Sequence, residues 1–204
     1  ALHSAGAADR VPAWLAGRYP GREPGPLLTM LAKGLNCPLT SSLGRLFDAA
    51  AALLGLRQVN QYEAQAAMEL EALAWRHGPA TALAGGYELN GGILDFRPLL
   101  LNLSTEDQPG RGAARFHATL AAGLAAWTRA AARREHLDTV ALGGGCLQNA
   151  LLAQQLGEQL TRSGLQVLLP RRAPPGDGGL ALGQAWIARQ RRPTPPNTET
   201  PPCA

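Results

Sequence analysis

Two short apolar runs, each next to a helical pattern, constrain the fold most. LDTVALGGG at residues 137–145 and LQVLLP at residues 165–170 are short enough to be buried strands. The helical pattern NALLAQQLGEQLTRSG lies between them, and DGGLALGQAWIARQ follows the second run. Strands that alternate with helices pair in parallel, because the helix carries the chain back across the sheet. This half of the chain therefore predicts an α/β layer.

The first half predicts mostly helices. Apolar residues recur at helical spacing over residues 27–36, 43–54 and 63–75, and an alanine-rich helix is expected over residues 111–135. Thr40, Ser41 and Ser42 offer N-terminal caps for the second of these helices, and Gly55 offers its end.

Three stretches predict irregular structure or turns. Asn90-Gly91 lies between two half-apolar runs, which is typical of a β-hairpin. Residues 11–26 are rich in proline and glycine and predict a loop, so that residues 1–26 should be largely loop. A folded region is expected over residues 1–190. The tail that follows it, residues 191–204, reads RRPTPPNTETPPCA, and its proline- and threonine-rich composition predicts disorder.

Composition excludes several classes of protein. The net charge is +4, and the arginines are scattered, so no basic stripe indicates a nucleic-acid partner. Aromatic residues make up only 5% of the chain, so no base-stacking surface indicates one either. Cys37, Cys146 and Cys203 form no CxxC motif, which favours a reducing cytoplasm. No apolar run reaches membrane-spanning length, so no membrane is expected as a partner. The chain begins with Ala1, which suggests a fragment of a longer polypeptide.

VALGGGCLQNALL places Gly143 and Gly144 between a strand and a helix, where backbone amides can approach a ligand. The alternative is a strand-to-helix turn that binds nothing, since the spacing matches neither a Rossmann nor a P-loop motif. Asn149 either caps the following helix or contacts a nucleoside with its amide.

Two acidic residues are candidates for a site. Gly44 and Asp48 share one face of the helix that begins near Ser42. A glycine inside a helix costs about 1 kcal/mol, so either close helix packing or a ligand should offset it. Asp48 could instead pair with Arg45. Asp177 lies among glycines before the last helix, where it either caps the helix or reaches a metal.

Six stretches in order resemble the C-terminal part of HypF-type carbamoyltransferases, which are hydrogenase maturation factors. They are NCPLTSSLGRLFDAAAALLGL, QYEAQAAMELEALA, LDFRPLL, AARFHATLA, LGGGCLQNALL and PPGDGGLALGQA, and they extend over about residues 30–190. The resemblance implies the second lobe of a Kae1-like domain of the actin/Hsp70/sugar-kinase superfamily, an α/β fold that holds a nucleotide between two lobes.

The resemblance also implies a reaction and the residues of a site. Carbamoyl phosphate and ATP, with magnesium, would give a carbamoyl-adenylate, and the carbamoyl group would pass to the C-terminal cysteine of a HypE-like acceptor protein to make the cyanide of [NiFe] hydrogenase. The residues that would contact the nucleoside are Gly44, Asp48, Gly143, Gly144 and Asn149. An active-site iron or zinc would be bound by Asp177.

Two alternatives to this assignment stay open, and the implied site is incomplete. The histidine motif of the family's first lobe is absent from this sequence, so we expect the isolated chain to be inactive and to bind nucleotide weakly. A related O-carbamoyl or threonylcarbamoyl transferase is one alternative, and a non-catalytic lobe that binds a partner is the other.

Overall fold

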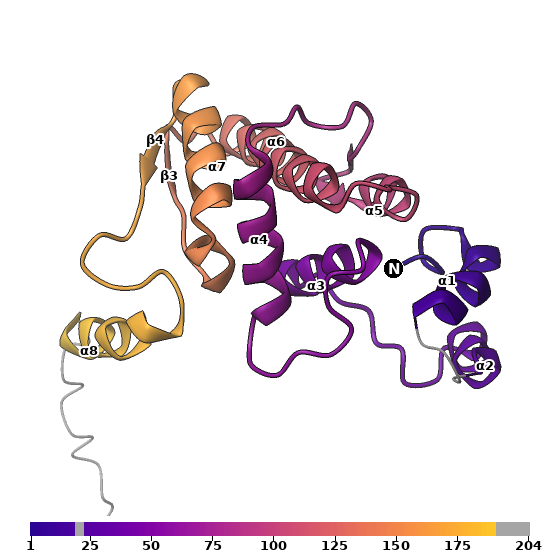
Figure 1. Ribbon diagram of the computed structural model, residues 1–204. Helices are drawn as coiled ribbons and strands as arrows, with labels where there is room; N and C mark the ends of the chain where they lie inside the picture. Colours follow the sequence, from indigo (N-terminus) through magenta and orange to yellow (C-terminus); the bar gives the residue numbers. More distant parts are fainter. Residues whose placement is uncertain (19–22, 191–204) are drawn as a thin grey trace, which may run out of the picture.

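A computed structural model describes residues 1–18 and 23–190 (Figure 1). The long helix α6 packs against its neighbours α4, α7, α5 and α3. Large apolar side chains between these helices are fully buried, among them Phe47, Leu70, Phe116, Leu120 and Leu152. The bounds of these helices are α3 Leu43–Leu53, α4 Gln65–His77, α5 Arg97–Leu103, α6 Pro109–Arg134 and α7 Ala150–Arg162.

Glycines let two parts of the chain approach α6 closely. A Cβ at Gly112 would lie 2.5 Å from Leu54 Cδ2, and a Cβ at Gly123 would lie 2.7 Å from the Phe96 ring. Neither distance leaves room for a methyl group, so these positions require glycine for packing.

The predicted parallel pairing is confirmed. β3 (Thr139–Ala141) and β4 (Gln166–Leu168) pair in parallel with Val140 opposite Val167, and α7 connects them. α7 ends at Arg162, and Gly164 follows in the left-handed conformation with a φ of 88°. The carboxyl ends of both strands therefore lie at the same edge of this small sheet.

The predicted hairpin forms, but its turn lies one residue later than expected. β1 (Glu88–Asn90) and β2 (Ile93–Asp95) are antiparallel, and Asn90 pairs directly with Ile93. The two turn residues are thus Gly91 and Gly92, with φ of 56° and 82°. Positive φ at both turn positions suits glycine, and Gly-Gly is one of the residue pairs that such a two-residue turn prefers.

The loop prediction for residues 11–26 is wrong at residues 11–18 and 25–26, and its residues 19–22 lie outside the described residues. A short 3-10 helix, η1 (Ala8–Arg10), leads into α1 (Val11–Arg18), and α2 extends over Gly25–Lys33. Pro12 stands at the second position of α1, where its missing N–H would have no partner in the helix anyway. Val11 is buried, and Trp14 and Leu15 pack against the core at helical spacing, so tertiary contacts stabilise this helix.

Other helices form at or near their predicted places. Ser42 caps α3, as expected, and Gly34 follows α2 in the left-handed conformation. α5 was not expected from the sequence, although Leu99, Leu100 and Leu103 are buried on one of its faces. The predicted disordered tail at residues 191–204 lies outside the described residues.

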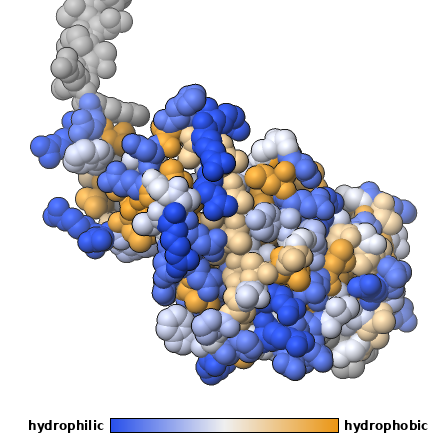
Figure 2. All heavy atoms as spheres, turned by 90° about the horizontal axis from the view of Figure 1, so that it is seen from above, coloured by the Kyte–Doolittle hydropathy of each residue, from blue (hydrophilic) through white to orange (hydrophobic). Residues whose placement is uncertain are grey.

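The last helix, α8 (Leu180–Gln190), follows the 3-10 helix η3 (Asp177–Gly179) and lies apart from the helical body in Figure 1. Its main contacts are with η3, and it carries several exposed apolar side chains: Leu180, Leu182, Trp186 and Ile187. Figure 2 shows apolar patches separated by hydrophilic side chains on one face of the molecule. Among the described helices, none is both long and apolar enough to cross a membrane.

Candidate functional site

The glycine turn after β3 has an exposed backbone. Gly143, Gly144 and Gly145 are exposed. Apart from their chain neighbours, no atom of the described residues lies within 4 Å of the place where a Cβ would stand on any of them. Gly144 has a φ of 102°, a conformation that favours glycine. The turn continues through the 3-10 helix η2 (Gly145–Gln148) into α7. A ligand could therefore approach this backbone closely, as the sequence predicts.

The turn that carries Asp177 packs directly on this glycine turn. The Gly144 N–H donates to the Pro175 carbonyl oxygen at 2.6 Å. A Cβ at Gly176 would lie 2.8 Å from Gln148 Nε2 and 3.2 Å from Gly145 Cα. The structure thus brings Gly143, Gly144 and Asp177 into one region at the carboxyl ends of β3 and β4.

These contacts give the glycines around Asp177 a packing role that the sequence did not reveal. A Cβ at Gly176 would be tight against the Gly145 backbone of η2, and a Cβ at Gly179 would lie 2.7 Å from the Pro174 carbonyl oxygen. Asp177 itself is exposed. Its carboxylate accepts no hydrogen bond within residues 1–18 and 23–190, so it does not act as a side-chain cap of η3. The carboxylate is free to bind a ligand.

Gly44 and Asp48 lie on α3, and both are half-buried. The only described atom within 4 Å of a Cβ at Gly44 would be Ser42 Oγ, at 3.6 Å. Close packing among the described residues therefore does not explain this glycine, and its place in a ligand site stays a prediction. Asp48 pairs with Arg45 at 3.1 Å, and the 71% exposure of the Arg45 side chain makes this ion pair weak.

Asn149 is buried and caps α7. Its Oδ1 accepts a hydrogen bond from the Leu152 N–H at 2.8 Å, which confirms the cap predicted from the sequence. Its Nδ2 lies 3.1 Å from His117 Nε2. Both polar atoms of the side chain are therefore held by the protein, and one N–H of the amide remains available.

His117 connects Asn149 to α3. The imidazole is fully buried in α6, and its Nδ1 lies 2.8 Å from the Ala113 carbonyl oxygen. The ring stands edge-on to Phe47, the neighbour of Asp48, with centroids 5.7 Å apart. Burial lowers the pKa of His117 below its usual value. Asn149 lies 32 positions from His117 in the chain, so no local sequence pattern indicates this contact.

A carboxylate occupies part of the entrance to α7. Glu71 Oε1, from α4, accepts a hydrogen bond from the Leu151 N–H at 3.2 Å. Together with the Asn149 cap, it uses two of the first amides of α7, which would otherwise attract an anion. The glycine turn therefore offers a ligand more open backbone than the helix end does.

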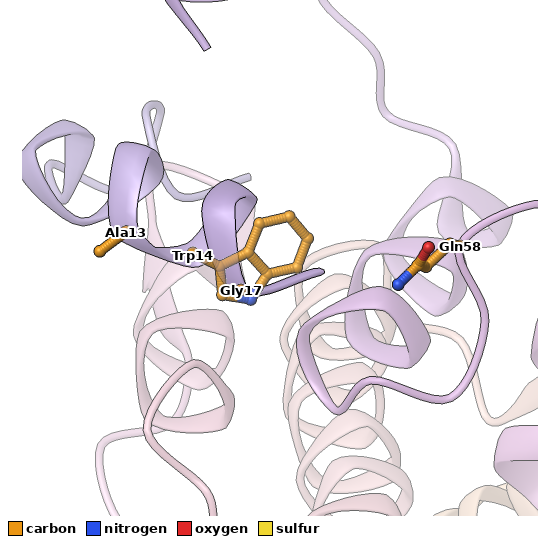
Figure 3. Close-up of a pocket in the computed structure, with 4 residues that line it drawn as sticks. All are labelled: Ala13, Trp14, Gly17 and Gln58. Carbon is orange, nitrogen blue, oxygen red and sulfur yellow. The ribbon is translucent and has the colours of Figure 1, made fainter. Parts of the chain in front are cut away.

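Two surface hollows are lined by residues other than the predicted site residues. One is lined by Ala13, Trp14 and Gly17 of α1 together with Gln58 (Figure 3). The other lies beside α8 and is lined by Arg172, Gly179, Leu182, Gly183 and Trp186. None of the six predicted site positions lines either of these two hollows.

The described residues do not make a complete metal site. Within residues 1–18 and 23–190, no group of three or more histidine, cysteine, aspartate or glutamate side chains could hold a metal ion. Asp177 supplies one carboxylate, and a stably bound iron or zinc needs several ligands.

Comparison with known proteins identifies the family. Residues 1–184 match the family model described as carbamoyltransferase, Kae1-like domain, second subdomain. The chain belongs to the HypF-type carbamoyltransferase family. It is 45% identical over 95% of its length to carbamoyltransferase HypF2 of Cupriavidus necator and 50% identical over 93% of its length to carbamoyltransferase HypF of Rhizobium leguminosarum bv. viciae.

The fold agrees with solved structures of this family. The crystal structure of full-length HypF in the phosphate- and nucleotide-bound form superposes with a TM-score of 0.73 at 30% identity, over 89% of this chain and 25% of that one. HypF of T. kodakarensis gives a TM-score of 0.69 at 28% identity, over 79% of this chain and 21% of that one. The predicted α/β, Kae1-like lobe is confirmed. The chain spans about a quarter of the length of these two curated relatives, 27% and 24%.

Proposed function

We propose that this chain forms one wall of a nucleotide site for carbamoyl transfer. In this proposal ATP and carbamoyl phosphate give a carbamoyl-adenylate with release of pyrophosphate and phosphate. The C-terminal cysteine thiol of a HypE-like acceptor then takes the carbamoyl group, AMP and the thiol proton leave, and the thiocarbamate provides the cyanide ligand of [NiFe] hydrogenase. Membership of the HypF-type family supports the group that is transferred. The phosphate- and nucleotide-bound form of the similar full-length HypF supports the kind of ligand.

One observation carries the proposal: the open glycine backbone of residues 143–145 lies against the turn that presents Asp177. Gly143 and Gly144 would let a nucleoside approach the main chain, and the remaining N–H of Asn149 would donate to it. Gly44 and Asp48 would contact the nucleoside from α3, since a side chain at position 44 would stand in the open space.

We assign to Asp177 an electrostatic role toward the phosphate end of the nucleotide. A magnesium ion bound with ATP would neutralise phosphate charge, and the free Asp177 carboxylate is of the oxygen type that such an ion prefers. Iron or zinc would need ligands beyond the described residues. We place the reaction in the cytoplasm, because Cys37 and Cys146 are free thiols.

The test compares Asp177→Ala and Asp48→Ala in the complete gene product that contains this chain. We expect each variant to transfer carbamoyl groups at least about tenfold more slowly, because each loses a charge at the nucleotide. Both side chains are at least partly exposed, so the melting temperature should change little. The measurement is the rate of carbamoylation of the acceptor's C-terminal cysteine, followed by mass spectrometry.

Asp9→Ala is the matched control, because Asp9 is an exposed aspartate in η1, on the N-terminal segment. It should keep the rate of the unaltered protein. Unchanged rates for both Asp177→Ala and Asp48→Ala would show that the site is assigned wrongly. A complete gene product that binds its acceptor but transfers no carbamoyl group would instead favour the non-catalytic lobe.

A further inference from the structure

We propose that His117 is a positioning residue, which holds the Asn149 amide in the orientation that meets the nucleoside. This inference rests on the proposed function and adds to it a residue on a different helix. Three elements meet at this point: α6 carries His117, α3 carries Phe47, and Asn149 begins α7.

The cap fixes which way the Asn149 amide faces. The Leu152 N–H can only donate, and it lies 2.8 Å from the Asn149 side chain, so the atom that accepts from it is Oδ1. The amide nitrogen Nδ2 must then point toward His117, at 3.1 Å from Nε2. Because Nδ2 only donates, His117 Nε2 must accept.

The other side of the ring supports the same assignment. The Ala113 carbonyl oxygen can only accept, and it lies 2.8 Å from Nδ1, so Nδ1 carries the proton. A neutral imidazole protonated on Nδ1 has its lone pair on Nε2, as the contact with Asn149 requires. Phe47 and Phe116 surround the ring, and Glu71 of α4 is the charged group that acts on it.

This arrangement has a consequence for the ligand. An apolar ring could fill the space between Phe47 and Phe116, but it would leave Asn149 Nδ2 without its buried acceptor. The amide could then rotate away from its cap or become mobile. Since Asn149 adjoins the exposed glycine turn, its one free N–H would lose a fixed direction toward the nucleoside.

The test uses two variants of the complete gene product. His117→Phe keeps an aromatic ring but removes both nitrogens, and His117→Gln restores an acceptor near the Nε2 position. We expect His117→Phe to raise the KM for ATP about 3- to 10-fold with kcat within about twofold, which corresponds to the loss of one hydrogen bond. We expect His117→Gln to keep the KM within about twofold of the unaltered protein.

A spectroscopic readout does not depend on the nucleotide. The ¹⁵N NMR shifts of the imidazole should show the proton on Nδ1 and an unprotonated Nε2 near neutral pH. A proton on Nε2 would overturn the proposal, and so would an unchanged KM in folded His117→Phe or an equal rise of KM in both variants. If His117→Phe does not fold, a normal KM in His117→Gln supports the proposal and a raised one contradicts it.

Asn149→Ala separates this inference from the proposed function. If Asn149→Ala raises the KM for ATP and His117→Phe does not, only the role of His117 is wrong. If Asn149→Ala leaves the KM unchanged, Asn149 is not part of the nucleotide site, and the role of His117 fails with it.

Discussion

At the residue scale, the fold strongly stabilises the negative charge of Glu106. Its side chain is only 2% exposed and lies at the junction of α5 and α6. Arg111 Nη2 donates to it at 2.7 Å, and Arg115 Nη1 lies 3.2 Å from its second oxygen. Hydrogen bonds from Arg111 lower the pKa of Glu106 to about 2. The charged form is thus part of the folded structure.

This pKa predicts a loss of stability in acid. A carboxyl group with a lowered folded pKa stabilises the protein fully above its unfolded value of 4.5, and this stabilisation disappears as the pH falls toward about 2. We expect Glu106→Gln to lower the free energy of unfolding by about 1–3 kcal/mol at pH 7. The difference between the two proteins should shrink between pH 4.5 and pH 2. Urea denaturation at several pH values measures it.

Asp107→Asn provides the control for Glu106→Gln. Asp107 pairs with the same Arg111 at 3.0 Å, but its side chain is 80% exposed. Exposed ion pairs contribute little, so this variant should lose less than about 1 kcal/mol. A difference between Glu106→Gln and the unaltered protein that stays constant from pH 7 to pH 3 would contradict the role given to this carboxylate.

At the scale of elements, α6 is the helix on which α3, α4, α5 and α7 pack, and its glycines set how closely their side chains approach. Gly123 faces the Phe96 ring, which stands where a Cβ would need to be. α7 also contains a glycine, Gly157, but no atom lies within 4 Å of the corresponding position there. Close packing thus explains Gly123 in α6, whereas no packing among the described atoms explains Gly157 in α7.

Gly123→Ala and Gly157→Ala should therefore change stability in opposite directions. The first adds a methyl group 2.7 Å from Phe96 ring atoms, and we expect a net loss of about 1–2 kcal/mol because overpacking exceeds the gain in helix propensity. The second should stabilise the protein by about 0.5–1 kcal/mol. Thermal unfolding followed by circular dichroism compares them, and an equal effect of both variants would contradict the packing argument.

At the scale of the whole molecule, the described residues form one wall of the proposed site. Asp177 lacks co-ligands among them, and none of the six site positions lines either hollow that the structure outlines. α8 also lies apart from the helical body with Leu182 and Trp186 exposed (Figure 1). The chain spans about a quarter of its relatives, 27% and 24% of their lengths.

We therefore expect the isolated 204-residue chain to bind nucleotide weakly and to transfer no carbamoyl group. A ligand held from one side buries little of its surface and keeps most of its contact with water. Isothermal titration with ATP and Mg²⁺ should give a Kd no tighter than about 0.1–1 mM. The complete gene product is the positive control, and micromolar binding by the isolated chain would contradict this expectation.

The sequence by itself determined the parallel pair and most helices. Their signals are local: apolar residues at helical spacing in α3 and α4, the Ser42 cap, and glycines at positive φ such as Gly34 and Gly164. It also indicated the open backbone at Gly143 and Gly144, because glycine after a strand needs no distant partner to be recognised.

Only the tertiary structure decided the features that depend on residues far apart in the chain. α1 forms because Val11 and Trp14 reach the core, although its proline and glycine content favours a loop. Gly176 packs closely on the Gly145 backbone, and His117 contacts Asn149 across 32 positions. Steric exclusion and buried hydrogen bonds are properties of atoms brought together by folding, so no local pattern in the sequence records them.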